Sequence, residues 1–163
     1  MKEQSRLQWK RILIVDDEPD VIETLEELLS ECVIEKAMSF GEAKEKLESQ
    51  DFDTAILDIM GVDGYRLLEI ANARKVTSIM LTAHAMTVED TYKSYKKGAA
   101  YFVPKAEMAN ITVFLNDILE AKEKGKTSWW RWLDRLGSYY DKEFGPDWKE
   151  GNRDLWEKMN YLP

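Results

Sequence analysis

The chain has 163 residues, 44% of them hydrophobic and 33% charged, with a formal net charge of -8, which is typical of one folded domain with an appendage. One cysteine and one histidine exclude an internal disulfide and a Cys/His zinc site, so any metal would be held by oxygen atoms. No apolar stretch is long enough to cross a bilayer and Met1 to Lys10 is polar, so we expect a cytoplasmic protein.

Charge is distributed unevenly along the chain. Residues 126–163 hold seven basic and seven acidic side chains, so the whole net charge of -8 belongs to residues 1–125. Binding to a phosphate backbone depends on clustered lysine and arginine, and neither part has such a cluster. We therefore expect no direct contact with nucleic acid.

Short apolar runs alternate with helical periodicities through residues 11–125. Five runs predict strands at residues 11–15, 33–37, 54–57, 78–82 and 100–103. Each run is followed by apolar residues at helical spacing, which predicts helices at residues 19–32, 40–49, 65–73, 88–97 and 108–124. Because parallel strands need crossover connections, this alternation predicts an α/β fold with a doubly wound, five-stranded parallel sheet.

Polar residues stand where four of the predicted strands end. The first strand is followed by Asp16 and Asp17, the third by Asp58, the fourth ends in Thr82 and the fifth is followed by Lys105. One acid after a strand is usually only a solvated cap, but carboxylates that converge at one edge of a sheet repel each other unless a cation such as Mg²⁺ lies among them. An aspartate there can act as a nucleophile toward a phosphoryl group.

Four motifs resemble one known family, the receiver domain of bacterial two-component response regulators. The resemblance covers Arg11 to Lys124 and implies a flavodoxin-like fold. The motifs are Ile-Val-Asp16-Asp17-Glu18-Pro19, Leu57-Asp58-Ile59-Met60, Leu81-Thr82-Ala83 and Gly98-Ala99-Ala100-Tyr101-Phe102-Val103-Pro104-Lys105, in the family's order.

The resemblance implies a role for each matching acid. Asp58 takes the place of the phosphoacceptor. Mg²⁺ is then held by Asp17, Asp58 and the backbone carbonyl of Met60, with Asp16 acting through a water molecule.

The other matching positions concern the phosphoryl group and the switch. Thr82 corresponds to the switch hydroxyl and Lys105 to the phosphate-pairing lysine, and the backbone of Ala83 also binds the phosphoryl group. Phe102 corresponds to the aromatic side chain whose rotation reports phosphorylation.

The family mechanism implies partners as well. A histidine kinase or a phosphotransfer protein donates the phosphoryl group to Asp58 while Mg²⁺ neutralises charge on the transferring oxygens. The chain is then a phosphoacceptor switch and not an enzyme, with intrinsic chemistry for its own phosphorylation and dephosphorylation. The surface from the fourth to the fifth helix changes, and a second copy or a partner protein binds there.

Two residues flank the predicted site and are expected to adjust the lifetime of the phosphoaspartate. Bulky Met60 would shield the acyl phosphate from water, and His84 would orient a water molecule. The alternative for His84 is a loop histidine without a role.

The sequence departs from the family in two places. The turn Met60–Gly64 is two residues shorter than the commonest version, so the carbonyl of Met60 follows a different path. Lys105 is followed by Ala106, where the family usually has proline. We expect a trans peptide bond there, because a cis bond before a non-proline residue costs about 2.5–4 kcal/mol.

Residues 126–163 form an aromatic-rich helical extension, separate from the N-terminal segment 1–10 and the receiver 11–125. A helix is predicted with Trp129, Leu133, Leu136 and Tyr140 on one face and an end at Phe144-Gly145-Pro146, followed by a second helix at 148–159. The extension either folds back on its own receiver or docks on a second subunit or another protein. Binding to a membrane surface is disfavoured, because the extension lacks a polybasic face.

Two other function classes compete with the switch. One is a phosphorylation-independent interaction or dimerisation module on a receiver scaffold, and the retained Asp58, Thr82 and Lys105 argue against it. The other is a Mg²⁺-dependent phosphatase with an aspartate nucleophile. That class needs a second acid two residues after the nucleophile, where this chain has Met60.

Overall fold

The computed structural model describes residues 5–83 and 88–150, and the chain forms two compact units, Met1–Asn116 and Asp117–Pro163. The boundary between the units lies inside the helix α5 (Ile111–Glu123). All strands found in the described residues therefore lie in the first unit. The second unit contains the end of α5 and the chain that follows it.

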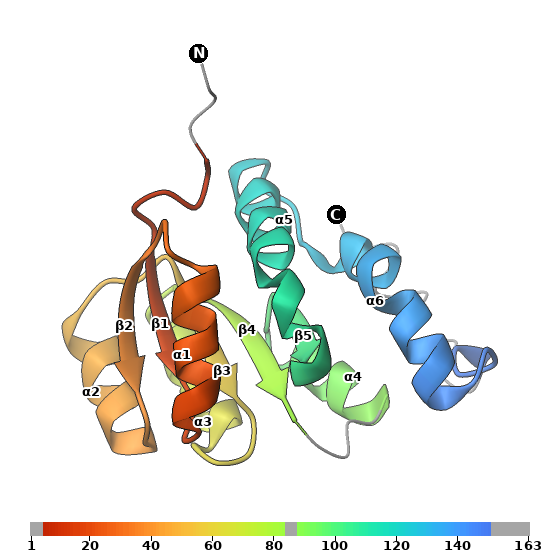
Figure 1. Ribbon diagram of the computed structural model, residues 1–163, viewed down its shortest axis with the longest axis horizontal. Coiled ribbons are helices and arrows are strands. Elements are labelled where there is room, and N and C mark those ends of the chain that lie inside the picture. The colour runs from red at the N-terminus through yellow and green to blue at the C-terminus, as the bar shows by residue number, and fades with distance from the viewer. Residues whose placement is uncertain (1–4, 84–87, 151–163) are drawn as a thin grey trace. The chain divides into compact units, whose positions relative to one another are not determined.

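The first unit is built on one parallel sheet. Its strands are β1 (Arg11–Val15), β2 (Val33–Ala37), β3 (Thr54–Asp58), β4 (Thr77–Thr82) and β5 (Tyr101–Pro104). They lie in the order β2-β1-β3-β4-β5, and every neighbouring pair is parallel (Figure 1). This order confirms the predicted doubly wound, flavodoxin-like fold and puts the crevice for ligands at the carboxyl ends of β1 and β3.

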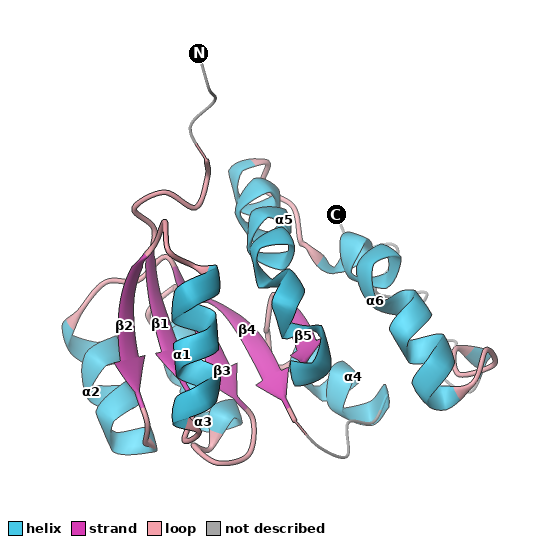
Figure 2. Ribbon diagram, viewed as in Figure 1, coloured by secondary structure: helices cyan, strands magenta, loops and turns pink. Residues whose placement is uncertain are grey.

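Helices connect the strands and cover the sheet. They are α1 (Pro19–Leu28), α2 (Phe40–Ser49), α3 (Gly64–Ala73) and α4 (Val88–Lys96), with the start of α5. Figure 2 shows α1 and the start of α5 in front of the sheet and α2 and α3 behind it. Since helices lie on both faces, the central strand β3 is buried along its whole length, as the apolar run predicted.

The start of α2 shows how local sequence sets a helix boundary. The hydroxyl of Ser39 accepts a hydrogen bond from the backbone N–H of Glu42 at 3.2 Å. The carboxylate of Glu42 accepts one from the backbone N–H of Met38 at 2.9 Å. These bonds pair backbone donors that a helix start leaves unsatisfied, so they fix the start of α2.

Two helices, α1 and α5, differ from the predicted ranges by more than one residue at one end. The helix α1 ends at Leu28 and not near Cys32, because the chain turns there to enter β2, with the N–H of Cys32 donating to the carbonyl of Leu29 at 2.9 Å. Before α5, residues Lys105–Asn110 form a 3-10 helix. Met108 lies in that tighter turn, which has three residues per turn, so it is off the buried face that starts at Ile111.

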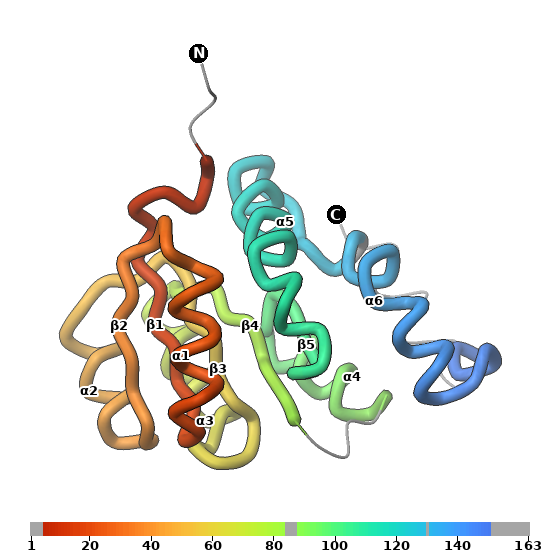
Figure 3. Tube along the Cα trace, viewed as in Figure 1, coloured from red at the N-terminus to blue at the C-terminus, as the bar shows by residue number. Residues whose placement is uncertain are grey.

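The chain enters β1 from a short N-terminal segment (Figure 3). Leu7 is buried there, and its carbonyl accepts a hydrogen bond from the thiol of Cys32 at 3.3 Å. Burial raises the pKa of Cys32 to about 11, with help from the charges of Glu31 and Asp53. The thiol is therefore protonated at neutral pH and serves packing.

The second unit contains the helix α6 (Trp129–Phe144), which ends at Gly145 as predicted. Gly145 has a φ of 85°, a conformation that glycine adopts at little cost. No helix in residues 5–83 and 88–150 is long and apolar enough to cross a membrane. Most of the predicted second helix at 148–159 lies outside the described residues, as do Trp156 and Tyr161.

Aromatic rings pack against each other within this second unit. The ring centroids of Trp132 and Tyr140 are 4.8 Å apart with an edge-on geometry, and those of Tyr140 and Trp148 are 4.9 Å apart. Trp132 is fully buried, while Leu133 of the predicted face is only half-buried. The other three residues of the predicted face, Trp129, Leu136 and Tyr140, are buried, so the face is confirmed except that Trp132 takes the place of Leu133.

Candidate functional site

The carboxyl ends of the parallel strands bring the predicted polar residues to one edge of the sheet. Asp16 follows β1, Asp58 is the last residue of β3, Thr82 is the last of β4 and Lys105 follows β5. Asp58 is paired with Leu81, and Thr82 with Pro104, in the strand register. All three oxygen-bearing residues are buried, and Asp58 is only 5% exposed. A carboxylate held out of water at the end of a strand needs a partner for its charge.

Lys105 joins the acids of this edge. Its ammonium nitrogen lies 2.9 Å from Oδ2 of Asp16, 3.3 Å from Oε1 of Glu18 and 3.5 Å from Oδ1 of Asp58. Burial by itself would lower the pKa of Lys105, but the hydrogen bond and charge of Asp16, with the charges of Asp58 and Glu18, raise it above its ordinary value. One cation thus faces three carboxylates, and the edge keeps surplus negative charge.

The pKa of Asp58 reflects the surplus of negative charge at this edge. Burial raises the pKa of its carboxyl above the ordinary 3.8, and the charge of Asp16 raises it further. Lys105 and the N–H of Gly61 act in the opposite direction without cancelling this effect. Because the ionised form is disfavoured where it stands, added positive charge would stabilise it.

The acids after β1 offer oxygen ligands for a cation. One carboxylate oxygen from each of Asp16, Asp17 and Glu18 lies within 4.8 Å of the others. Asp16 is fixed further by the N–H of Glu18, which donates to its Oδ1 at 2.9 Å. Hard oxygen donors beside a surplus of negative charge fit Mg²⁺ in their chemistry. Of the predicted ligands, Asp16 and Asp17 belong to this group. Asp58 is linked to the group by Lys105, which pairs with both Asp16 and Asp58.

Glu18 and Gly61 contact the site without having been assigned a role from the sequence. Glu18 stands in the quoted motif, but its pairing with Lys105 joins residues 87 positions apart, which no local pattern reveals. The N–H of Gly61 donates to Oδ2 of Asp58 at 3.2 Å. The only available signal for Gly61 was the shortness of the turn in which it lies.

The turn after β3 closes on itself. The carbonyl of Met60, the predicted backbone ligand, accepts a hydrogen bond from the N–H of Asp63 at 3.3 Å, and the carbonyl of Ile59 accepts one from the N–H of Gly64 at 3.0 Å. The side chain of Met60 is 78% exposed. The short turn therefore has a fixed path of its own, with the carbonyl of Met60 retaining one free lone pair.

The predicted switch residues lie on β4, β5 and the loop after β4. Thr82 is buried and Phe102 is fully buried in β5, while Ala83 is exposed. No cis peptide bond occurs in the described residues, so the bond from Lys105 to Ala106 is trans, as expected. His84 lies outside the described residues.

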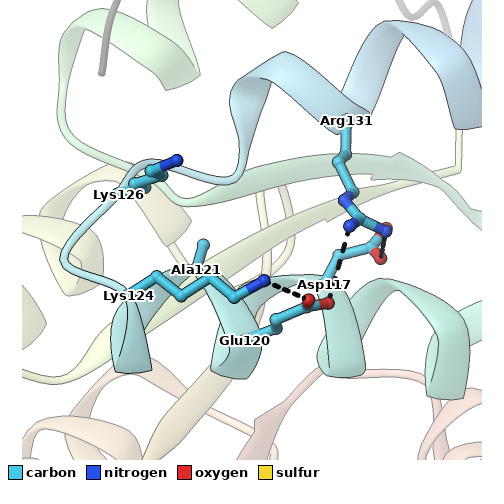
Figure 4. Close-up of a pocket in the computed structure, with 6 residues that line it drawn as sticks. All are labelled: Asp117, Glu120, Ala121, Lys124, Lys126 and Arg131. Atoms are coloured by element: carbon cyan, nitrogen blue, oxygen red, sulfur yellow. Dashed lines mark hydrogen bonds and ion pairs between the residues drawn. The ribbon is translucent and has the colours of Figure 1, made fainter.

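The second unit contains a different kind of polar site, a cavity of about 150 Å³ (Figure 4). Four of its charged side chains form ion pairs: Lys124 with Glu120 at 2.8 Å, and Arg131 with Asp117 and with Glu120 at 3.7 Å. Because these opposite charges neutralise each other, we interpret the four residues as structural ion pairs and not as a ligand site.

Comparisons with known proteins agree with the geometry of the first unit. A family model of the response regulator receiver domain matches residues 12–115. The two-component response regulator ARR18 of Arabidopsis thaliana is 39% identical over 94 residues, which are 54% of this chain and 14% of that protein. The chain therefore spans a small part of this curated relative.

Solved structures support the same assignment. A CheY-like response regulator receiver domain protein from Methanospirillum hungatei has 29% identity and a TM-score of 0.65, with 72% of this chain and 99% of that chain covered. A putative response regulator from Chloroflexus aurantiacus has 26% identity and a TM-score of 0.61, with 69% and 99% covered. Together with the acid edge around Asp58, these matches establish that the chain belongs to the response regulator receiver domain family.

Proposed function

We propose that Asp58 accepts a phosphoryl group from the phosphohistidine of a histidine kinase or phosphotransfer protein, in a Mg²⁺-dependent reaction. The observation that carries this proposal is the position of Asp58. It is the last residue of β3, it is 5% exposed, and the ammonium of Lys105 lies 3.5 Å from its Oδ1. Such a carboxylate can be reached at one edge only and has a cation ready to pair with an incoming phosphoryl oxygen.

The chemistry is a displacement at phosphorus. A carboxylate oxygen of Asp58 forms the new P–O bond, the P–N bond to the donor histidine breaks, and its electron pair stays on the imidazole nitrogen. Asp17, Asp58 and the carbonyl of Met60 would hold Mg²⁺, with Asp16 acting through water. The metal supplies neutralisation of charge on the transferring oxygens.

The proposed output is a change in the surface formed by α4, β5 and α5. Thr82 and the N–H of Ala83 bind phosphoryl oxygens, Lys105 pairs with the new charge, and the ring of Phe102 turns toward the space that Thr82 leaves. This is a population shift, limited by the difference in phosphoryl contacts between the two states. A second copy or a partner protein then binds this surface of residues 11–125 or the extension 126–163, in a cytoplasmic setting and without nucleic acid.

The lifetime of the phosphoaspartate depends on the residues beside it. Met60 and His84 are proposed to modulate attack by water, Met60 as a shield and His84 through an oriented water molecule. Equal dephosphorylation half-lives of the parent and His84→Ala would remove His84 from the mechanism.

The test is phosphorylation of the full chain by acetyl phosphate and Mg²⁺, followed by intact mass. We expect the mass of one phosphoryl group to be added to the parent and none to Asp58→Asn. A chelator in place of Mg²⁺ is expected to prevent the addition. A parent of unchanged mass, or equal labelling of Asp58→Asn, would contradict the proposal.

One observation favours a second function, an interaction module that works without phosphorylation. Lys105 contacts Asp16, Glu18 and Asp58, so a side chain of the protein itself neutralises part of the acid edge. The same experiment separates the two functions, because a scaffold would keep its mass in the presence of Mg²⁺ and acetyl phosphate.

A further inference from the structure

We propose that Gly61 is a positioning residue for the Mg²⁺ site, which keeps open the space beside the carboxylate of Asp17. This inference rests on the proposed function, because it concerns the metal that serves Asp58. It assigns a specific task to the shortened turn after β3.

The contacts of Gly61 converge on two predicted metal ligands. Its N–H donates to Oδ2 of Asp58 at 3.2 Å. A Cβ built on Gly61 would collide with the carboxyl carbon and both carboxylate oxygens of Asp17, and these are the three nearest atoms it would meet. Its chain neighbour Met60 carries the predicted carbonyl ligand. One residue of the turn thus touches or adjoins every predicted direct ligand of the metal.

The need for glycine at this position comes from space and not from the backbone. Gly61 does not have the positive φ that side chains avoid, whereas Gly98 and Gly125 do. The backbone would therefore accept alanine, and the obstacle is the Asp17 carboxylate. Because that carboxylate is the exposed end of a side chain, it can rotate away at low cost to the fold.

Gly64 in the same turn provides the contrast. A Cβ on Gly64 would collide with the backbone carbonyl of Asp58 and come within 2.9 Å of the Cα of Ile59. Backbone cannot move aside without disturbing β3, so Gly64 serves the fold. A methyl group on Gly61 would instead press on the flat face of the Asp17 carboxylate, so that carboxylate would have to turn away from the position from which it binds the cation.

The test is binding of Mg²⁺ to the full chain, measured by isothermal titration calorimetry with no phosphodonor present. We expect Gly61→Ala to bind Mg²⁺ at least tenfold more weakly than the parent. In a chelator, it should unfold within about 3 °C of the parent, because only a side chain has moved. Gly41→Ala is the matched control, since a Cβ there meets nothing within 4 Å, and it should bind Mg²⁺ like the parent.

A second background shows whether Gly61 acts through Asp17. In Asp17→Ala the obstacle and the ligand are both absent, so adding Gly61→Ala should change Mg²⁺ affinity by less than twofold. A tenfold further loss in that background, or affinity of Gly61→Ala within twofold of the parent, would overturn the inference. If Gly61→Ala alone does not fold, the double variant must melt like Asp17→Ala, and an unfolded double variant also overturns it.

The inference and the proposed function fail differently. A parent that binds Mg²⁺ and gains a phosphoryl group, with Gly61→Ala binding Mg²⁺ equally well, overturns only the role of Gly61. A parent that binds Mg²⁺ in a Gly61-dependent way but stays unphosphorylated overturns only the function. A parent that binds no Mg²⁺ overturns both.

Discussion

Asp58 in the first unit and Asp117 in the second are equally buried, at 5% and 4% exposed, and differ in their partners. Asp117 accepts two hydrogen bonds from the guanidinium of Arg135, at 3.0 and 3.2 Å, and Arg131 lies 3.7 Å away. Asp58 shares the single ammonium of Lys105 with Asp16 and Glu18. Burial alone therefore does not distinguish Asp117 from the proposed phosphoacceptor Asp58, whereas the balance of charge around each acid does.

The two acids differ in how they would respond to added charge. Asp117 pairs with the guanidinium groups of Arg135 and Arg131, so another cation would stabilise it little. At the edge of β1 and β3 the carboxylates outnumber the cation, and the pKa of Asp58 is raised by burial and by Asp16. A second cation, or a phosphoryl group with its added negative charge, therefore changes the energy of that edge more than it would change the energy of the matched pair.

The largest expected effect is on the matched pair. Asp117→Asn should lower the free energy of unfolding by about 2–4 kcal/mol, because it leaves the Arg135 guanidinium without its bidentate partner. Chemical denaturation measures the loss, and Asp134→Asn, exposed on α6, is the control with an expected change below about 0.5 kcal/mol. Labelling by acetyl phosphate should persist in folded Asp117→Asn. Its loss would mean that the two acids are not distinct in role.

A smaller effect is expected at the shared cation. Lys105→Met should destabilise the chain by about 1–3 kcal/mol in chelator, because Asp16 stays buried without its 2.9 Å partner. Saturating Mg²⁺ should recover part of this loss, since the metal brings positive charge to the same acids. Lys124→Met is the control, because its pair with Glu120 is at the surface and contributes about 1 kcal/mol or less. A loss in Lys105→Met that Mg²⁺ does not reduce would show that the edge is not a cation site.

How far the sequence predicts the molecule depends on the range of the interactions involved. The strand Arg11–Val15 was predicted to the residue, because the four apolar residues after Arg11 are buried and a short apolar run next to charges is typical of such a strand. The 3-10 turn at Lys105–Asn110 was missed, since Met108 satisfies helical spacing whether or not its own turn is α-helical. Local periodicity thus defines elements well and their first turns poorly.

The topology of the sheet predicts which residues meet at the acid edge, but it does not predict the individual contacts among them. Asp16, Asp58 and Lys105 had to meet once the strands were parallel, because each follows the carboxyl end of a strand. The ion pair of Lys105 with Glu18 and the contact of Gly61 with Asp17 depend on loop paths that no periodic pattern encodes. Within the helix α6, Trp132 is fully buried and packs against Tyr140 while Leu133 is half-buried, a difference that residue spacing alone does not predict.

The smallest effect has the opposite sign and tests the charge balance most directly. A raised pKa means that folded Asp58 holds its proton more tightly than the unfolded chain does, so its ionisation costs stability. This loss of stability is absent below the ordinary pKa of 3.8 and complete above the raised pKa.

The variant Asp58→Asn has no carboxyl group to ionise, so in chelator it should melt at a higher temperature than the parent at pH 7. Asp51→Asn, exposed in a loop, should melt like the parent. The gain should shrink as the pH falls toward 4 and the parent carboxyl takes up its proton. If the variant melts below the parent at pH 7, pairing with Lys105 outweighs the effect of burial. Asp58 would then resemble Asp117 in being stabilised by its cation.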